Sequence, residues 1–150
     1  MHNKNNRKGF TLIEMLVVIA IIAVLVAVII PTVSSATTKA QAATDAANLR
    51  STLGVLNVEV MDGDVTVVEV LDAALHPTSK MDKDAALCVV YDEPGFIDVY
   101  YINKTTGKFY GLAYLSEVAA NGTSDLSTDK PAVPAGSKWY EAGVGEVNFG

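Results

Sequence analysis

The sequence predicts an α+β protein in which a long N-terminal α-helix packs on a small antiparallel β-sheet head. Three observations support this fold class. Residues 15–30 contain no charged or polar side chain. Apolar residues then recur at helical spacing up to about residue 56. After residue 84, short runs rich in β-branched and aromatic residues alternate with turn sequences, which is typical of a meander of short strands.

One helix is predicted from about residue 10 to about residue 56. Its first part, residues 10–30, contains twenty-one residues, which span about 31 Å as a helix, close to the hydrocarbon thickness of a bilayer. The second part is amphipathic and is expected to pack against the head. The apolar residues on its line are Ala42, Ala46, Leu49, Leu53 and Leu56, and the polar residues that fall off this line are Thr44, Asp45, Asn48 and Ser51.

Pro31 directly follows the uncharged apolar run. Proline lacks a backbone donor and disfavours a helical conformation at the preceding residue. Two interpretations therefore stay open at this position. The helix ends there, or it continues with a kink or local opening that lets it bend or stretch.

The segment after the long helix begins with a turn. Asp62-Gly63-Asp64 is a turn sequence, and residues 66–69 match a capping box that predicts a short helix to about residue 75. Acids gather here, but they lack the twelve-residue pattern of a calcium loop, so we interpret them as a solvated turn. They are Asp62, Asp64, Glu69 and Asp72.

Three strands are predicted for the head, at residues 85–91, 96–103 and 108–114, joined by two turns in an antiparallel meander. Strand alternation places Tyr100 and Tyr101 on opposite faces of this sheet. From residue 116 onward the regularity falls away. Trp139-Tyr140 and residues 144–149 are candidates for a returning strand that holds the tail to the head.

Several function classes have little support in the composition. Without Lys4, Arg7 and Lys8 the chain keeps eight basic residues and seventeen acidic ones, a formal charge of −9, which gives no clear nucleic acid site. The single cysteine, Cys88, lies among apolar neighbours and is interpreted as a buried small hydrophobic residue. With only two histidines, the sequence predicts no catalytic constellation, no metal site and no cofactor, and therefore not an enzyme.

The N-terminus is open to three interpretations. A secretory signal peptide explains the basic start, but the apolar run exceeds the usual upper length of about 15 residues. A plain membrane anchor explains the length and predicts a cytoplasmic N-terminus from the basic flank. It gives no reason for Glu14, because a charge in a spanning helix costs up to about 3 kcal/mol and marks a functional site.

The third interpretation accounts for Glu14. Residues 8–14, Lys-Gly-Phe-Thr-Leu-Ile-Glu, resemble the processing site of type IV prepilins and the related pseudopilins. This resemblance implies that prepilin peptidase cuts between Gly9 and Phe10 and that the new amine of Phe10 is methylated. It also implies that Glu14 and Pro31 are the family's characteristic acid and proline. Many members close the C-terminal region with a disulfide, which one cysteine cannot form.

The resemblance implies a domain organisation and a set of partners. Residues 1–9 form a leader that is removed, residues 10–31 a transmembrane and filament-core helix, and residues 32–150 an extracytoplasmic pilin-like head. The expected partners are further copies of the chain, prepilin peptidase, a membrane assembly platform and the lipid bilayer. The precursor is expected to cross the cytoplasmic membrane once, before the subunit enters a surface filament.

The predicted function is that of a type IV pilin, a structural subunit of a surface filament for adhesion, motility or related processes. The alternative is a pseudopilin of a type II secretion or DNA-uptake system, which shares the same N-terminus. In either assembly Glu14 is expected to pair with the cationic amine of Phe10 on a neighbouring subunit, because two opposite charges are less costly to bury together than alone.

Overall fold

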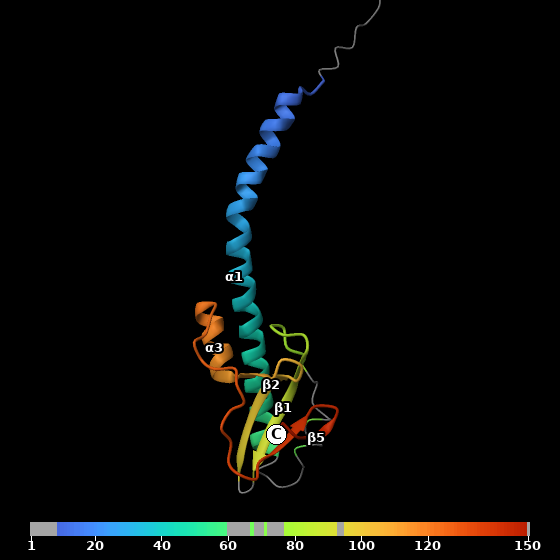
Figure 1. Cartoon of the computed structure of the whole chain (residues 1–150), viewed down its shortest axis with the longest axis vertical. Coiled ribbons are helices and arrows are strands. Elements are labelled where there is room, and N and C mark those ends of the chain that lie inside the picture. Colours follow the sequence, from blue (N-terminus) through green and yellow to red (C-terminus); the bar gives the residue numbers. More distant parts are fainter. Residues whose placement is uncertain (1–8, 60–66, 68–70, 72–76, 93–94, 150) are drawn as a thin grey trace, which may run out of the picture. The chain divides into compact units, whose positions relative to one another are not determined.

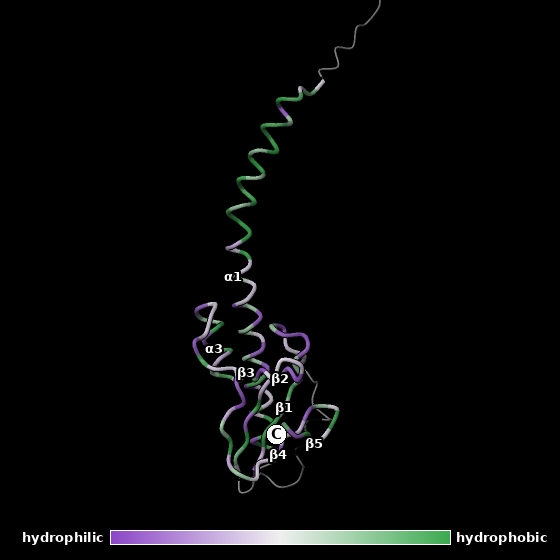
Figure 2. The backbone as a smooth tube through the Cα atoms, viewed as in Figure 1, coloured by the Kyte–Doolittle hydropathy of each residue, from purple (hydrophilic) through white to green (hydrophobic). Residues whose placement is uncertain are grey.

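The computed structural model describes residues 9–59, 67, 71, 77–92 and 95–149. The chain divides into two compact units, Met1–Ser35 and Ala36–Gly150. Helix α1 extends over Leu12–Glu59, in agreement with the helix predicted for residues 10–56. Its N-terminal part carries the continuous apolar stretch, which stands out in Figure 2. A long helix and a small antiparallel sheet make up an α+β, pilin-like arrangement, as predicted.

The head contains a five-stranded antiparallel sheet with the order β3-β2-β1-β4-β5. Figure 1 labels the strands β1, β2 and β5 of this sheet. Strands β1 (Ala85–Asp92) and β2 (Phe96–Asn103) pair along their whole length. The strand β3 (Lys108–Gly111) pairs with β2 at one edge of the sheet. The predicted return of the tail is confirmed, because β4 (Lys138–Glu141) pairs with β1 and β5 (Gly145–Val147) pairs with β4.

The sheet face toward α1 forms the main core of the head. Leu49 and Leu56 of α1 are fully buried and pack with alternate strand residues such as Val89, Val99 and Tyr101. Each of these side chains gains about 1.5–3 kcal/mol from leaving water. The predicted apolar line of the amphipathic half is therefore the core-facing line of the helix.

Asp45 departs from that prediction. The pattern placed it off the apolar line, yet its side chain is fully buried in the head. The hydroxyl of Ser79 donates to Asp45 Oδ2 over 2.6 Å, and the backbone N–H groups of Lys80 and Met81 donate to the same carboxylate. These donors repay part of the desolvation of the carboxylate and fix the segment before β1 to the helix.

The opposite face of the sheet carries a second apolar cluster. Cys88, Val90, Ile102, Phe109 and Trp139 are buried there. Tyr100 lies on this face and Tyr101 on the other, so the predicted alternation is confirmed. Tyr100 is half-buried and packs beside Trp139, with 5.8 Å between the ring centroids.

Helix α3 (Leu112–Asn121) corrects the predicted third strand. The sequence suggested a strand through Tyr114 and irregular structure from residue 116, but β3 ends at Gly111. Leu115 and Val118 are one helical turn apart and both are buried. A helix places both side chains on the same face, so this burial favours a helix over an extended chain. The helix ends where Gly122 adopts a left-handed conformation with φ 90°, and its N–H donates to the carbonyl of Val118 over 2.7 Å.

The short helix predicted for residues 66–75 lies mostly outside the described residues. Within it only Val67 and Leu71 are described, and both are helical and buried in the main core. The acidic turn considered for calcium lies outside the described residues altogether.

Candidate assembly site at the N-terminus

The predicted cleavage site lies in exposed backbone just ahead of α1. Gly9 and Phe10 have no regular secondary structure, and the side chain of Phe10 is 79% exposed. Helix α1 begins two residues after Phe10, at Leu12. A peptidase that binds an extended segment therefore meets no helix to unwind at this bond. The basic residues Lys4, Arg7 and Lys8 lie outside the described residues.

Glu14 lies in the first turn of α1 and contacts Thr11. Glu14 Oε2 accepts hydrogen bonds from the Thr11 backbone N–H (2.8 Å) and from the Thr11 hydroxyl (2.9 Å). The backbone N–H of Glu14 donates in return to Thr11 Oγ1 over 3.3 Å. This reciprocal pattern is a capping box, which satisfies backbone donors that the first turn leaves without helical partners.

Thr11 is a residue of this site that the sequence reasoning missed. The capping pattern, a threonine followed by a glutamate at the third position, is visible at Thr11–Glu14 in the sequence. The acid therefore has a structural role in its own subunit as well as the assembly role predicted for it. Any test of Glu14 has to separate its charge from its capping ability.

The large apolar side chains of the first part of α1 have almost no partner within their own unit. Their exposed fractions lie between 45% for Val26 and 82% for Leu12. Each such side chain gains about 1.5–3 kcal/mol when it leaves water, so this surface is strongly unfavourable in an aqueous environment. Among the described residues, α1 is the one helix long and apolar enough to cross a membrane. Contact with lipid or with further copies of the chain would remove this apolar surface from water.

Pro31 lies inside α1, so the interpretation in which the helix ends there is wrong. Because proline has no N–H, the carbonyl of Ala27 loses its usual helical donor. The next residue, Thr32, donates its hydroxyl to the carbonyls of Val28 and Ile29, each over 3.0 Å. These bonds add side-chain donors to two carbonyls of the turn that precedes the proline.

The cysteine and the potential metal ligands of the head can be placed where the structure describes them. Cys88 is fully buried, and burial raises the pKa of its thiol to about 12, so it remains protonated at neutral pH. No three potential metal ligands of the His, Cys, Asp and Glu type cluster in the part of the chain that the structure describes. His76 lies outside the described residues.

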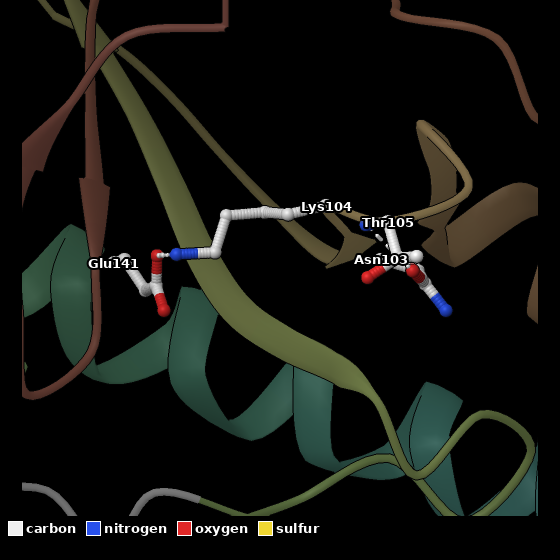
Figure 3. A network of polar contacts seen from close by, with 4 residues as sticks. All are labelled: Asn103, Lys104, Thr105 and Glu141. Carbon is white, nitrogen blue, oxygen red and sulfur yellow. Dashed lines mark hydrogen bonds and ion pairs between the residues drawn. The ribbon is translucent and has the colours of Figure 1, made fainter.

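Polar contacts on the head instead hold strands and turns in place, as Figure 3 shows. Lys104 Nζ pairs with Glu141 Oε2 at 2.6 Å, so the turn after β2 is joined to β4, and this hydrogen bond raises the pKa of Lys104. Asn103 accepts hydrogen bonds from the backbone N–H groups of Thr105 and Thr106. These contacts are structural, since they fix the β2–β3 turn and the C-terminal hairpin.

Comparison with known proteins gives one match. Residues 4–30 match the family model described as the prokaryotic N-terminal methylation motif. No curated protein and no solved structure matches the chain significantly. The matched residues contain Gly9, Phe10 and Glu14 and the whole apolar stretch of residues 15–30.

The motif fits the geometry of the N-terminal unit. It implies processing by prepilin peptidase and assembly in the manner of pili in general, and its family is structural and not enzymatic. The exposed apolar helix that begins within the motif fits a membrane-anchored precursor that later enters a surface filament. The motif, the apolar helix and the α+β head are together consistent with a type IV pilin-like or pseudopilin-like substrate of prepilin peptidase.

Proposed function

We propose that the chain is a structural subunit of a surface filament, a type IV pilin that polymerises through residues 10–31. The observation that carries this proposal is the combination of a methylation motif with an apolar helix that lacks partners in its own unit. Cleavage ahead of the helix, and not behind it, keeps the helix in the mature protein. The same apolar surface can then contact lipid first and neighbouring subunits later.

Processing creates the charge on which assembly depends. Cutting the bond between Gly9 and Phe10 leaves a cationic amine on Phe10, and methylation of an amine keeps that charge. Before assembly, the basic flank of Lys4, Arg7 and Lys8 holds the N-terminus on the cytoplasmic side of the membrane. The platform that extracts the subunit therefore receives a helix with a cation at its first residue and an anion at Glu14.

Assembly then exchanges one set of contacts for another. In lipid, Glu14 has Thr11 of its own chain as its hydrogen-bond partner. In the filament it meets the amine of Phe10 on a neighbouring subunit, and the pair neutralises two charges that are costly to bury alone. Moving the apolar side chains from lipid to a helix bundle replaces one apolar environment by another, so the transfer is close to balanced.

The domain boundary is part of the proposal. We assign residues 10–31 to the membrane and filament core and residues 32–150 to an extracytoplasmic head. The head's own core supports this assignment, because Leu49, Leu56 and the inner face of the sheet bury one another. A fragment that begins at Pro31 should be soluble and monomeric, with the circular dichroism of mixed helix and strand. An aggregated or unfolded fragment would place the boundary elsewhere.

The test of the function combines mass spectrometry with electron microscopy. Material sheared from the cell surface should contain filaments whose subunit begins at N-methylated Phe10. The small residues Ser34-Ser35-Ala36 could serve as a secretory cleavage site, so a mature chain that begins after Ala36 would show an ordinary secretory signal and would overturn the proposal. A subunit processed at Phe10 but absent from the sheared filaments would identify a pseudopilin, since a short pseudopilus shares the N-terminal chemistry and is not abundant on the surface.

A further inference from the structure

A groove lies on one side of α1, where the segment before β1 comes beside the helix. Its volume is about 590 Å³, which is large enough to admit a protruding side chain. One wall comes from α1 and the other from residues 78–83, and the residues that matter here are Ala40, Gln41, Thr44, Thr78, Lys80 and Lys83. All of them belong to the unit Ala36–Gly150, so the groove is a feature of the head by itself.

The two walls of this groove are fixed to each other by the buried carboxylate of Asp45. It accepts hydrogen bonds from the hydroxyl of Ser79 and from the backbone N–H groups of Lys80 and Met81. The side chains of Lys80 and Lys83 remain exposed at the groove. Because the walls are already joined, a partner can enter the groove without the cost of ordering this segment.

The groove carries positive charge although the head is acidic. From residue 36 onward the chain has eight basic and sixteen acidic residues, but no Asp or Glu lines the groove. Among the described residues, the ammonium groups of Lys80 and Lys83 take part in no ion pair or hydrogen bond. The adjacent Asp82 is engaged elsewhere, since its carboxylate accepts hydrogen bonds from Asn103 and Tyr110. A partner that fits this groove therefore presents a carboxylate.

The loop after α3 has the complementary character. Its Leu126 is 48% exposed, although most large apolar side chains of the head are buried. The neighbouring Asp125 is exposed, and within the described part of the chain its carboxylate has no hydrogen bond or ion pair. Residues 112–129 contain no lysine, arginine or histidine. The loop thus presents an apolar side chain beside an unpaired carboxylate.

The groove and this loop flank α1 on different sides, so they do not meet within one chain. Lys39 and Arg50 of α1 hold α3, by donating to the Ala120 carbonyl and to the Ser116 hydroxyl. At about 100° per residue, these two side chains project about 140° around the helix from those that line the groove. Figure 1 shows α3 and the segment before β1 on opposite sides of α1. A contact between two different surfaces of identical copies repeats from copy to copy and builds an open fibre where the rotation does not close.

We propose that the groove receives the Asp125–Leu126 loop of a neighbouring copy in the filament, an inference that rests on the proposed function. Leu126 enters between α1 and the segment before β1, and the Asp125 carboxylate pairs with Lys80 or Lys83. A contact this small does not hold free heads together, which agrees with the monomer expected for the fragment that begins at Pro31. In a filament the joined helices bring the heads to an effective concentration of the order of millimolar, and the contact then forms.

Zero-length cross-linking tests this contact in sheared filaments of the full-length chain. A water-soluble carbodiimide activates a carboxylate, and a lysine amine in contact with it displaces the urea and forms an amide. We expect covalent dimers and larger multimers in which mass spectrometry finds Asp125 joined to Lys80 or Lys83. Lys80→Gln combined with Lys83→Gln should abolish this product. Lys108→Gln is the matched control and should leave the product unchanged, because Lys108 is exposed and does not line the groove.

Two further variants make the test specific to the proposed fit. Lys80→Glu with Lys83→Glu should also abolish the product, and Asp125→Lys in the same chain should restore it, with the amine and the carboxylate now exchanged between the partners. Leu126→Ala keeps every charge, so a loss of product in this variant would show that the apolar side chain seats the loop. An unchanged yield from Leu126→Ala would overturn the proposed fit.

The remaining outcomes separate this inference from the proposed function. Intact filaments without the Asp125 product would overturn the inference and leave the proposed function standing. The same conclusion would follow from equal losses in the groove variant and in Lys108→Gln, or from the two groove lysines joined to a protein other than this chain. A lack of filaments would overturn the proposed function and this inference together.

Discussion

The two parts of helix α1 differ in what their apolar side chains contact. In residues 36–59, Leu49 and Leu56 are fully buried in the head, while in residues 12–35 leucines of the same size, such as Leu25, are more than half exposed. One part has its partners within its own unit, and the other has to find them in lipid or in further copies. The same secondary structure thus serves folding of the head in one part and, in our proposal, assembly in the other.

This difference also explains where polar groups are tolerated. In the head part, Asp45 is buried with several donors supplied by the chain itself. In the N-terminal part, Glu14 has only local hydrogen bonds from Thr11, and its charge has no cation among the described residues. The carboxylate of Asp45 thus finds its partners within its own unit. In our proposal, the carboxylate of Glu14 finds a cation only on assembly, in the Phe10 amine of a neighbouring subunit.

The largest expected effect comes from separating charge from capping at the N-terminus. Glu14→Gln keeps the capping box, since glutamine serves as well as glutamate in that pattern, but it removes the charge. If the neighbouring amine is left unpaired in the filament, assembly loses about 3–5 kcal/mol, and few or no filaments should form. Membrane levels of the subunit should be unchanged. The measurement pairs a membrane immunoblot with the yield of sheared filaments.

The matched variant is Thr11→Val, which removes the cap and keeps the charge. Losing a cap costs a helix about 1 kcal/mol, so Thr11→Val should still assemble at a reduced or normal yield. The reverse pattern, with normal filaments from Glu14→Gln and none from Thr11→Val, would mean that Glu14 acts through its helix cap. That result would contradict the proposed charge pair between Glu14 and the neighbouring Phe10 amine.

A second prediction compares the same substitution in both parts of α1. Leu49→Ala should lower the free energy of unfolding of the head by about 2–5 kcal/mol, because it opens a cavity in a closed core. Leu25→Ala should leave that free energy unchanged, since Leu25 belongs to the N-terminal unit and its side chain is more than half exposed. Urea unfolding of the solubilised chain, followed by Trp139 fluorescence, measures both. Equal losses would show that the two parts of the helix are not independent.

A third prediction concerns the buried carboxylate. Asp45→Ala leaves the donors of Ser79, Lys80 and Met81 without their acceptor, and an unpaired buried donor costs about 1–3 kcal/mol. We expect the head to lose about 3 kcal/mol of stability in the same urea experiment. The neighbouring Thr44→Ala is the control, because that exposed hydroxyl bonds only to the Ala40 carbonyl of its own helix. A loss in Asp45→Ala no greater than in Thr44→Ala would contradict this role.

Sequence periodicity predicted the features that depend on local pattern. The bounds of α1 and of β2 follow from apolar spacing and from turn sequences, and the family motif at residues 4–30 is read from consecutive residues. The sequence pattern does not predict α3, because Tyr110 and Tyr114 both favour a single strand. In the structure the strand β3 ends at Gly111 and the helix α3 follows it directly. Aromatic residues favour strands, but the buried pair Leu115 and Val118 decided in favour of a helix.

The features that sequence reasoning missed depend on distant partners. Asp45 was expected off the core line because it does not follow the apolar spacing. Its burial depends on hydrogen-bond donors in residues 79–81, which lie far along the chain and give no local signal. The outer apolar cluster was not foreseen because Phe149 and Val133 come from a tail without clear periodicity. Thr11 is different, since its capping pattern with Glu14 was local and readable. The resemblance to a processing site drew attention to the acid alone.

The smallest expected effect is a loss of head stability at alkaline pH. Burial, with the nearby Asp45 charge, raises the pKa of Tyr101 to about 12, whereas a tyrosine in an unfolded chain ionises near pH 10. Between these values the folded state holds a proton that the unfolded state has lost. The contribution is therefore complete below about pH 10 and disappears as the pH rises toward 12.

Tyr101→Phe tests this contribution without removing the ring from the core. The variant loses the hydroxyl, which donates to the Pro77 carbonyl over 2.9 Å, so its stability at neutral pH should fall slightly. Its stability should then decline less steeply than that of the wild type above about pH 10. The N-terminal part of α1 has no tyrosine, so helix content there should not follow the same pH dependence. An identical alkaline slope in both proteins would show that Tyr101 ionises equally in the folded and unfolded states, and that its burial in the head does not protect its proton.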